Sequence, residues 1–524
     1  MPSQIGFLSL HRELRDIIYQ HYVFEADGYH FDYETGKLQA SNNRPIDLAL
    51  MYTCTTVAAE MRNLALGSNL ISFSTGHPSR DRLKAGRFQL LLAELHNAKC
   101  AALKFSTEPA NQPYLTPEVF AKVALRYPQF APLLHDRVDP VDDGGRQMQH
   151  DLRARLPVGN NWGEAGSVHR GFVDYFIEVL SANTGFAEAM AISSIDRQQH
   201  FQEADDRSVL YRSPLLLSSP TPWTIPSEDE VTEMGKVLDI TKVEHEPLSL
   251  LYNRTDFWQR VRWCYSAAAA AIQFFKSVPE KTRLGIQNVL LHEDRESVAY
   301  PECHALGLIP FCLENPRLRI ERRVNIWRTI LPAACFTDLE SFVRHDKRGE
   351  DGPIFRDISI CFASWITEAL ALSAAGMPAN SFSLVFDGDP DLERSSALFE
   401  IVKEGVAWQE AHSQWLMQKN MTRGFRERRG NGVYIFEGSL QAISDMVGGK
   451  SYIRCNFPIG NLCDVNYFLD ICRELPDSRR WYNKWLCYRF PKRFQLSPLL
   501  PTWVDLRLEQ VIPEEESPEG QASR

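Results

Sequence analysis

The densest group of side chains that could bind a metal or transfer protons lies between residues 292 and 312. Its members are the carboxylates, imidazoles and thiols that zinc sites and acid–base catalysts use: His292, Glu293, Asp294, Glu296, Glu302, Cys303, His304 and Cys312. Paired CxxC, HExxH or GxSxG spacings do not accompany them. We therefore expect these residues to cap helices and form ion pairs in loops. The alternative is an enzyme with a site near His292–Cys312.

Two shorter motifs have part of the pattern of a ligand-binding loop. Asp445–Ser451 ends in Gly-Gly-Lys-Ser, as a phosphate-binding loop does, but Ser444 stands where the first glycine is required. Asp387–Asp391 offers three carboxylates after a strand-like segment, but Leu392 and Leu398 occupy ligand and turn positions of a calcium loop. The sequence therefore predicts a helix end and a solvated turn, with neither a metal nor a cofactor.

A basic and aromatic segment lies between residues 479 and 494. Its six cations alternate with six aromatic side chains, an arrangement that could neutralise and stack single-stranded nucleic acid. Trp481, Trp485 and Tyr488 recur at i, i+4 and i+7, however, which predicts a helix that buries this stripe in the core. Because the net charge of the chain is -10, we do not expect nucleic acid to be a partner.

The composition is that of a folded protein with more than one core. The chain has 524 residues, of which 44% are hydrophobic and 24% charged, far from the signature of disorder. The start, MPSQIGFLSLHREL, lacks the pattern of a signal peptide, and the 11 cysteines are unevenly spaced. We therefore expect reduced thiols and a cytoplasmic or nuclear location. The most apolar run, Trp263–Phe275, is shorter than the roughly 20 residues that cross a bilayer, so it predicts a buried helix and no membrane contact.

Two amphipathic helices are predicted near the N-terminus. The first covers residues 10–23, where apolar side chains recur at helical spacing. The second covers residues 47–65 and ends at Gly67–Asn69. Strand-like segments at 29–33 and 70–74 lie on either side of the second helix. Since two short helices cannot bury their faces alone, we expect them to pack on each other and on residues 70–74.

The remaining chain is predicted to be rich in helices. Helical periodicity covers residues 88–103, 169–180, 256–276, 355–375 and 395–418. Short strands are expected at 286–291 and 382–386, and Asn431-Gly432 predicts a hairpin turn before residues 433–436.

Residues 7–19 resemble the start of an F-box-like domain in its filamentous-fungal variant. In that variant the first helix carries Glu-Leu-Arg followed by Ile-Tyr, here Glu13–Arg15 and Ile18-Tyr19. The second helix carries a cysteine and then another Glu-x-Arg, here Cys54 and Glu60–Arg62. The family usually has proline where this chain has His11, and the fixed φ of proline would pre-organise the helix entry.

The resemblance implies a protein-interaction adaptor. Because no catalytic motif is recognisable in the rest of the chain, we do not expect an enzyme. F-box proteins bind the adaptor Skp1 of a cullin ubiquitin ligase, while the rest of the chain holds a substrate. The implied contacts to a Skp1-like adaptor are Leu10, Leu14, Ile17 and Ile18. One alternative is that the same side chains form the core of the module itself. Another is that the F-box-like chain binds protein or RNA without a ligase role.

The two Glu-x-Arg motifs predict an ion pair between the helices. Residues two apart on a helix point in different directions and cannot pair with each other. We therefore predict that Glu13 pairs with Arg62, or Arg15 with Glu60, and that this pair fixes how the two helices pack.

Together these features predict an α+β fold that is predominantly helical, with an F-box-like helical module followed by one or two α-rich domains. The expected boundaries are 1–75 for the module, 76–202 for a helical domain, 203–229 for a linker rich in serine and proline, 230–510 for an α-rich α+β domain, and 511–524 for an acidic disordered tail.

Overall fold

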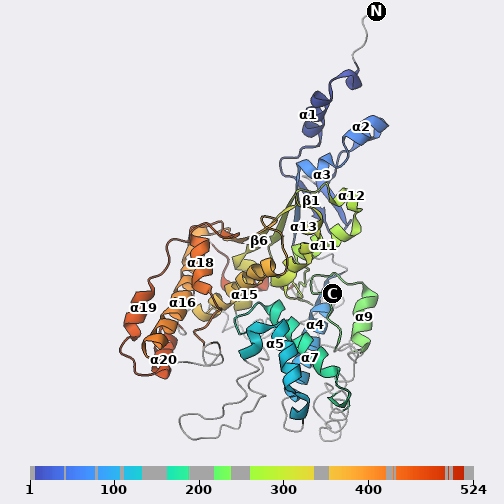
Figure 1. Ribbon diagram of the computed structural model, residues 1–524. Helices are drawn as coiled ribbons and strands as arrows, with labels where there is room; N and C mark the ends of the chain where they lie inside the picture. The colour runs from blue at the N-terminus through green and yellow to red at the C-terminus, as the bar shows by residue number, and fades with distance from the viewer. Residues whose placement is uncertain are drawn as a thin grey trace, which may run out of the picture.

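In the computed structural model, one β-sheet gathers strands from distant parts of the chain (Figure 1). The structure describes residues 6–40, 43–76, 81–106, 111–132, 162–186, 188, 217–237, 260–334, 353–420, 429, 432–489, 494 and 500–512. The strands in these ranges are β1 (Tyr29–Asp32), β2 (Lys37–Ala40), β3 (Arg44–Pro45), β4 (Leu70–Ser74), β5 (Asn288–Glu293), β6 (Arg319–Asn325), β7 (Phe382–Asp387) and β8 (Ile453–Cys455). They form a single eight-stranded sheet in the order β3-β2-β1-β4-β5-β6-β7-β8.

Most of this sheet is parallel and advances in one direction. β1, β4, β5, β6, β7 and β8 pair in parallel and follow one another in chain order, while β2 and β3 add an antiparallel edge. Each new parallel strand is added on the same side of the previous one. Because connections between parallel strands are right-handed, the connecting helices then lie on the same face of the sheet.

The helix-covered face of the sheet holds the main hydrophobic core. The helices that contribute to it include α11 (Ala267–Ser277), α13 (Ile309–Glu314), α15 (Phe355–Ala374), α16 (Leu392–Gln418) and α18 (Ser439–Val447). From the strands, the core receives fully or almost fully buried side chains such as Ile71, Phe73, Leu291, Val324 and Phe386. N-terminal and C-terminal strands therefore share one core.

The opposite face of the sheet, which we call the open face, carries half-exposed and mostly polar side chains. Along β6 the buried residues alternate with Glu321 and Arg323, whose side chains are 32% and 41% exposed. Leu290 of β5 and Ser383 of β7 flank Glu321 in register, and Arg454 of β8 lies two strands from Arg323. The alternation along β4, β5 and β6 thus separates a buried face from a solvated one.

Two further clusters of helices pack beside the sheet. One contains α4 (Arg82–Phe105), α5 (Pro117–Arg126), α7 (Gly166–Ser181) and α9 (Glu228–Val237), below the sheet in Figure 1. The other joins the second half of α16 to α19 (Val465–Cys472) and α20 (Ser478–Arg489) around buried tryptophans. α21 (Trp503–Leu508) returns to the main core.

Among the described residues, α15 is the helix that is long and apolar enough to cross a membrane by length and composition. It packs on the sheet, and Ile358, Phe362 and Ile366 are fully buried in the main core. Burial inside the protein therefore accounts for its apolar composition.

The predicted architecture, predominantly helical with an N-terminal helical module followed by one or two α-rich domains, is wrong. The structure has an eight-stranded mixed sheet at its centre, and β4, which ends the predicted 1–75 module, pairs with β5 along its whole length. Ile71 and Phe73 consequently lie in the same core as α15 and α16. Residues 29–74 therefore supply four neighbouring strands at one end of the central sheet, and β4 joins them to the main core.

Individual elements were predicted with more success. Strands lie within one residue of the predicted positions 29–33, 70–74 and 382–386, and the strand predicted at 286–291 lies two residues later, at 288–293. The helix predicted at 47–65 is broken into a 3-10 turn (Ala49–Tyr52), α2 (Thr55–Glu60) and α3 (Leu64–Ser68), because Cys54 is extended at φ -161° and Asn63 adopts φ 61°. No strand forms over residues 433–436, where the Ile435 N–H donates to the Gln409 side chain instead.

The described residues include only parts of the predicted linker and of the predicted tail. Residues 203–216 of the predicted linker and residues 513–524 of the predicted tail lie outside the described residues. The second half of the predicted linker, from residue 217, leads into α9 and contacts the first helical cluster, where Ser219 donates to Asp174 of α7 at 2.7 Å.

Candidate functional site

Helix α1 (Arg12–Val23) stands with α2 at the end of the molecule that is farthest from the helical body (Figure 1). Its inner face buries Tyr19 and Val23. They pack in one cluster with Tyr29 of β1, with Met61 between α2 and α3, and with Ala65 of α3. This small cluster is separate from the main core. The strand β1 that follows α1 thus fixes the helix to the edge of the sheet.

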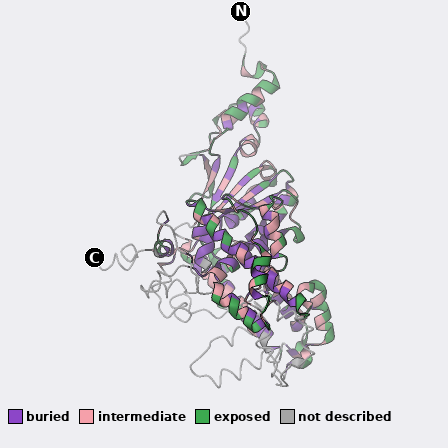
Figure 2. Ribbon diagram, turned by 90° about the vertical axis from the view of Figure 1, so that its left-hand side faces the viewer, coloured by how far each residue is buried: buried purple, intermediate pink, exposed green. Residues whose placement is uncertain are grey.

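The outer face of α1 exposes large apolar side chains; in Figure 2 the ribbon of this helix is coloured mainly as exposed. Leu14, Ile17 and Ile18 are 49%, 51% and 40% exposed, and Leu8 in the preceding turn is 49% exposed. Leu10 is half-buried. We call Leu8, Leu14, Ile17 and Ile18 the α1 surface. An apolar group of this kind on a fixed helix is typical of a protein-binding surface.

Arg15 ties α1 to α2 through Glu60. The Arg15 Nε and Nη2 atoms donate to the two carboxylate oxygens of Glu60 at 2.9 and 2.5 Å, and the Tyr19 hydroxyl donates to the same carboxylate at 2.7 Å. The hydrogen bond from Arg15 is the main reason why the pKa of Glu60 falls to about 2. Of the two pairs that the sequence predicts, the structure contains this one, whereas Glu13 and Arg62 are exposed.

The backbone before α1 has the conformation that a Leu-Pro sequence would adopt. His11 has φ -58° and is the N-cap residue, and its side chain makes no capping hydrogen bond. Leu10 is extended, at φ -68° and ψ 149°, which suits a residue before proline. Since proline fixes φ near -65°, His11 occupies the geometry of the family's proline without being one.

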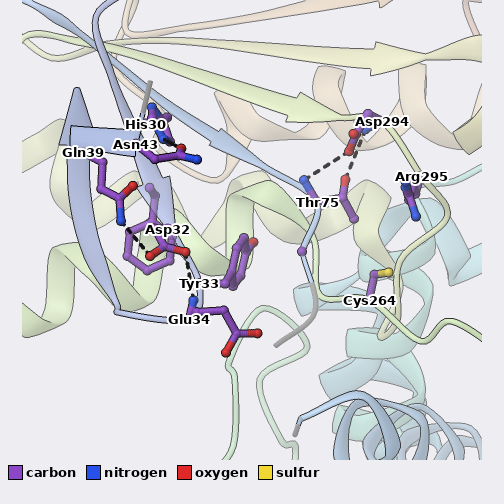
Figure 3. A pocket seen from close by; sticks show the side chains of 12 residues that line it. His30, Asp32, Tyr33, Glu34, Gln39, Asn43, Thr75, Cys264, Asp294 and Arg295 are labelled. Atoms are coloured by element: carbon purple, nitrogen blue, oxygen red, sulfur yellow. Dashed lines mark hydrogen bonds between the residues drawn. The ribbon is translucent and has the colours of Figure 1, made fainter. Parts of the chain in front are cut away.

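A cavity of about 490 Å3 lies where β1, β4 and β5 end (Figure 3). Ligands of parallel sheets commonly bind beyond the carboxyl ends of strands, so this cavity lies where a ligand-binding site would be expected. Its polar lining includes residues from the end of β1 and from the segments that follow β4 and β5: Asp32, Tyr33, Glu34, Thr75, Asp294 and Arg295.

The carboxylates of this cavity hold turns in place. Asp32 accepts hydrogen bonds from the Thr35 hydroxyl at 2.6 Å and from Gln39 at 2.8 Å, and the first of these lowers its pKa. Asp294 accepts from the Thr75 N–H at 3.2 Å. Burial raises the pKa of the nearby Cys264 thiol to about 12, so this cysteine is protonated at neutral pH and is a poor nucleophile.

The structure divides the 292–312 cluster between the two faces of the sheet. His292 lies on the open face, whereas Glu293 is fully buried on the helix-covered face. The Glu293 carboxylate accepts from the Ala267 and Ala268 N–H groups at the start of α11, at 3.0 and 3.2 Å. It also accepts two hydrogen bonds from Arg322 Nε and Nη2, at 2.9 and 2.7 Å.

The sequence analysis missed Arg322, which is 1% exposed and neutralises Glu293. The available signal was the alternation of Ile320, Arg322 and Val324, which places one cation among inward-facing residues. A buried cation requires a buried anion nearby.

His304 has a structural position as well. Its Nε2 lies 2.7 Å from the Ala299 carbonyl and its Nδ1 lies 2.6 Å from the Ser266 hydroxyl. Nε2 must donate to the carbonyl, so Nδ1 accepts from Ser266. Burial lowers the pKa of His304 to about 3 and raises the pKa of Cys312 to about 12. Among the described residues, no three His, Cys, Asp or Glu side chains are grouped so that they could hold a metal ion.

The other sequence motifs end or begin helices. α18 ends at Val447, and Gly449 adopts φ +65° in the turn that follows, as the Asp445–Ser451 motif predicts. Asp391 caps α16 by accepting from the Arg394 N–H at 3.0 Å. Trp481 and Trp485 of α20 are buried at 0% and 3% exposure, so the aromatic stripe belongs to the core as predicted.

No protein-family model matches this chain, and no curated protein or solved structure shows a significant similarity to it.

Proposed function

We propose that this chain is a protein-interaction adaptor that binds a partner through the α1 surface. The exposure of Leu14, Ile17 and Ile18 carries the proposal, because three neighbouring aliphatic side chains at 40 to 51% exposure lie on a helix whose other face is already packed. The Arg15–Glu60 pair holds that helix in a fixed orientation. A partner would therefore meet a pre-organised apolar surface, at a small cost in conformational entropy.

As the partner we propose a Skp1-like adaptor of a cullin ubiquitin ligase, which is the partner that the resemblance implies. Two local features support this choice. The Leu10–His11 backbone has the geometry of the family's Leu-Pro, and the two Glu-x-Arg motifs contribute one residue each to the same ion pair. An adaptor of this kind would present the remainder of the chain to a substrate protein.

Residues 1–75 cannot simply be deleted to test this proposal, because they contain part of the central sheet. Deleting residues 1–75 would remove β1 to β4 and, with Ile71 and Phe73, part of the main core, so a loss of binding would only report unfolding. The double substitution L14E/I17E changes two exposed positions and leaves the buried face of α1 intact. Two carboxylates on an apolar contact surface should reduce affinity for the partner strongly.

The experiment measures binding of the purified full chain to a purified Skp1-like adaptor by isothermal titration calorimetry. Leu125→Glu is the matched control, because Leu125 is 87% exposed on α5, away from α1. We expect wild type and L125E to bind equally and L14E/I17E to lose binding while its melting temperature stays the same. If wild type does not bind, the ligase role is rejected; if affinity capture then recovers another protein by way of the α1 surface, the chain is an adaptor outside the ligase.

A further inference from the structure

A larger cavity, of about 930 Å3, lies at the amino ends of β5 to β8 and extends over the open face of the sheet. Its lining includes strand residues such as Leu290, Glu321 and Ser383, the loop between α15 and β7, and the turn from Gly449 to Tyr452 before β8. We call this cavity the basic groove, after the cations that line it. It lies at the opposite ends of the strands from the cavity of Figure 3 and shares no lining residue with that cavity.

The charge of the basic groove is opposite to that of the whole chain. Four cations line it, Arg319, Arg323, Lys450 and Arg454, against the single carboxylate of Glu321, although the chain as a whole carries -10. A concentration of one sign of charge in a hollow focuses the electric field and attracts ligands of the other sign.

Most of this positive charge is not neutralised by the protein. Glu321 accepts from Arg323 at 2.7 Å and lies 3.6 Å from Arg454, so one carboxylate serves two guanidinium groups. Among the described residues, Arg319 donates to the Pro316 and Leu318 carbonyls, at 2.7 and 2.9 Å. Within the described part of the chain, neither Arg319 nor Lys450 has an ion-pair partner.

The groove also offers apolar contacts and an extended shape. Leu70, Leu290, Met377 and Tyr452 are among its lining residues. The lining reaches from β4 to β8, across four gaps between strands; at about 4.8 Å each this is roughly 19 Å, or about six residues of extended chain. Single-stranded nucleic acid usually stacks on several aromatic side chains, whereas the aromatic side chains lining this groove are Tyr452 and the buried Phe382.

We infer that the basic groove binds an extended acidic segment of a partner protein, in which carboxylates meet Arg319, Lys450 and the arginines of the open face while apolar side chains enter between them. This binding is separate from that of the α1 surface and does not depend on it. In an adaptor the groove would hold the second protein.

The test uses fluorescence anisotropy with the full chain and a fluorescein-labelled peptide of repeated Glu-Glu-Leu, about twelve residues long so that every register can be sampled. Parallel titrations use a Lys-Lys-Leu peptide and an oligouridylate of similar length. The double variant R319E/K450E removes the two unpaired cations. The matched control R479E/K484E reverses two exposed cations on α20, outside the groove.

We expect saturable binding of the acidic peptide, weakened about tenfold or more by R319E/K450E, unchanged by R479E/K484E and by L14E/I17E, and weakened by added salt. The lysine peptide should not bind. The inference is overturned if the acidic peptide does not bind, if R319E/K450E binds it as tightly as wild type, or if the oligouridylate binds more tightly and loses affinity in the same variant. A thermal melt of each variant shows that it remains folded.

Discussion

The buried pair between Glu293 and Arg322 gives the sharpest prediction about stability. Both side chains are almost fully buried, at 0% and 1% exposure, and the guanidinium lies 4.8 Å from the ring of Trp365. Substituting Glu293→Gln keeps the shape of the side chain but removes its charge. Arg322 then remains charged and buried, and its acceptors are neutral: the one oxygen of the new amide and the Pro301 carbonyl, which lies 2.7 Å from Nη2.

The expected loss in the free energy of unfolding of E293Q follows from the buried charge of Arg322, which is left without its anion. Removing one partner of a buried ion pair typically costs about 3–5 kcal/mol, and the lost charge at the start of α11 adds about 0.3–1 kcal/mol. Glu321→Gln is the matched control, because Glu321 also pairs with an arginine of β6, at 2.7 Å, but its side chain is 32% exposed. That exposed pair should be worth about 1 kcal/mol or less.

The measurement is urea-induced unfolding, followed by intrinsic tryptophan fluorescence and by circular dichroism. We expect the E293Q midpoint to fall by an amount equivalent to about 3–6 kcal/mol, and E293Q/R322M to recover part of the loss because no buried charge remains. If E293Q costs no more than E321Q, or if R322M worsens E293Q, the claim that this pair neutralises a buried charge is refuted.

Three further predictions concern other parts of the molecule. His11→Pro should stabilise the protein by about 0.4–1 kcal/mol, because the residue already has the φ of proline and Leu10 is extended; a lower melting temperature for H11P would contradict this geometry. Burial raises the pKa of Glu368 to about 7 from an ordinary value of 4.5, although the carboxylate accepts two hydrogen bonds from Ser167. As the pH rises, the native state therefore keeps this proton longer than the unfolded state does, so the free energy of unfolding should fall by about 3 kcal/mol between about pH 4.5 and about pH 7. Urea unfolding across this range should show a shallower pH dependence for Glu368→Gln than for wild type. Parallel curves for the two proteins would argue against a raised pKa of Glu368. Trp481→Ala should destabilise the protein by about 3–5 kcal/mol, since Trp481 is fully buried among aromatic rings, and an unchanged urea midpoint would place the stripe at the surface instead.

The sequence predicts those elements whose local pattern agrees with their place in the fold. β4, with Leu-Ile-Ser-Phe-Ser, and β7, with Phe-Ser-Leu-Val-Phe, have short apolar runs that identify them as strands. β6 was missed because Arg-Ile-Glu-Arg-Arg-Val-Asn places a cation at an inward position, and that cation is explained only by Glu293 of the neighbouring strand. A local pattern cannot reveal a partner that another segment supplies.

The same limit applies to the candidate sites. The Arg15–Glu60 pair could be predicted because two matching motifs on neighbouring helices suggest one contact. Whether Leu14 and Ile17 form a core or a surface could not be decided, since both alternatives require the same apolar spacing. The basic groove was not predicted at all, because Arg319 and Lys450 are brought together only by the order of the strands.

The pairing of β4 with β5 also has a consequence for how the protein is made. Residues 70–74 lie beside residues 288–293 in the finished sheet, so a ribosome must add about 200 residues before the partner strand of β4 exists, which takes roughly 10 to 40 s at common rates of synthesis. During this time Ile71 and Phe73, which end fully buried, have no core to enter, and the edge of β4 is open to other chains. We expect the nascent chain to depend on chaperones, and truncations that stop before β5 to aggregate instead of folding as an independent N-terminal domain.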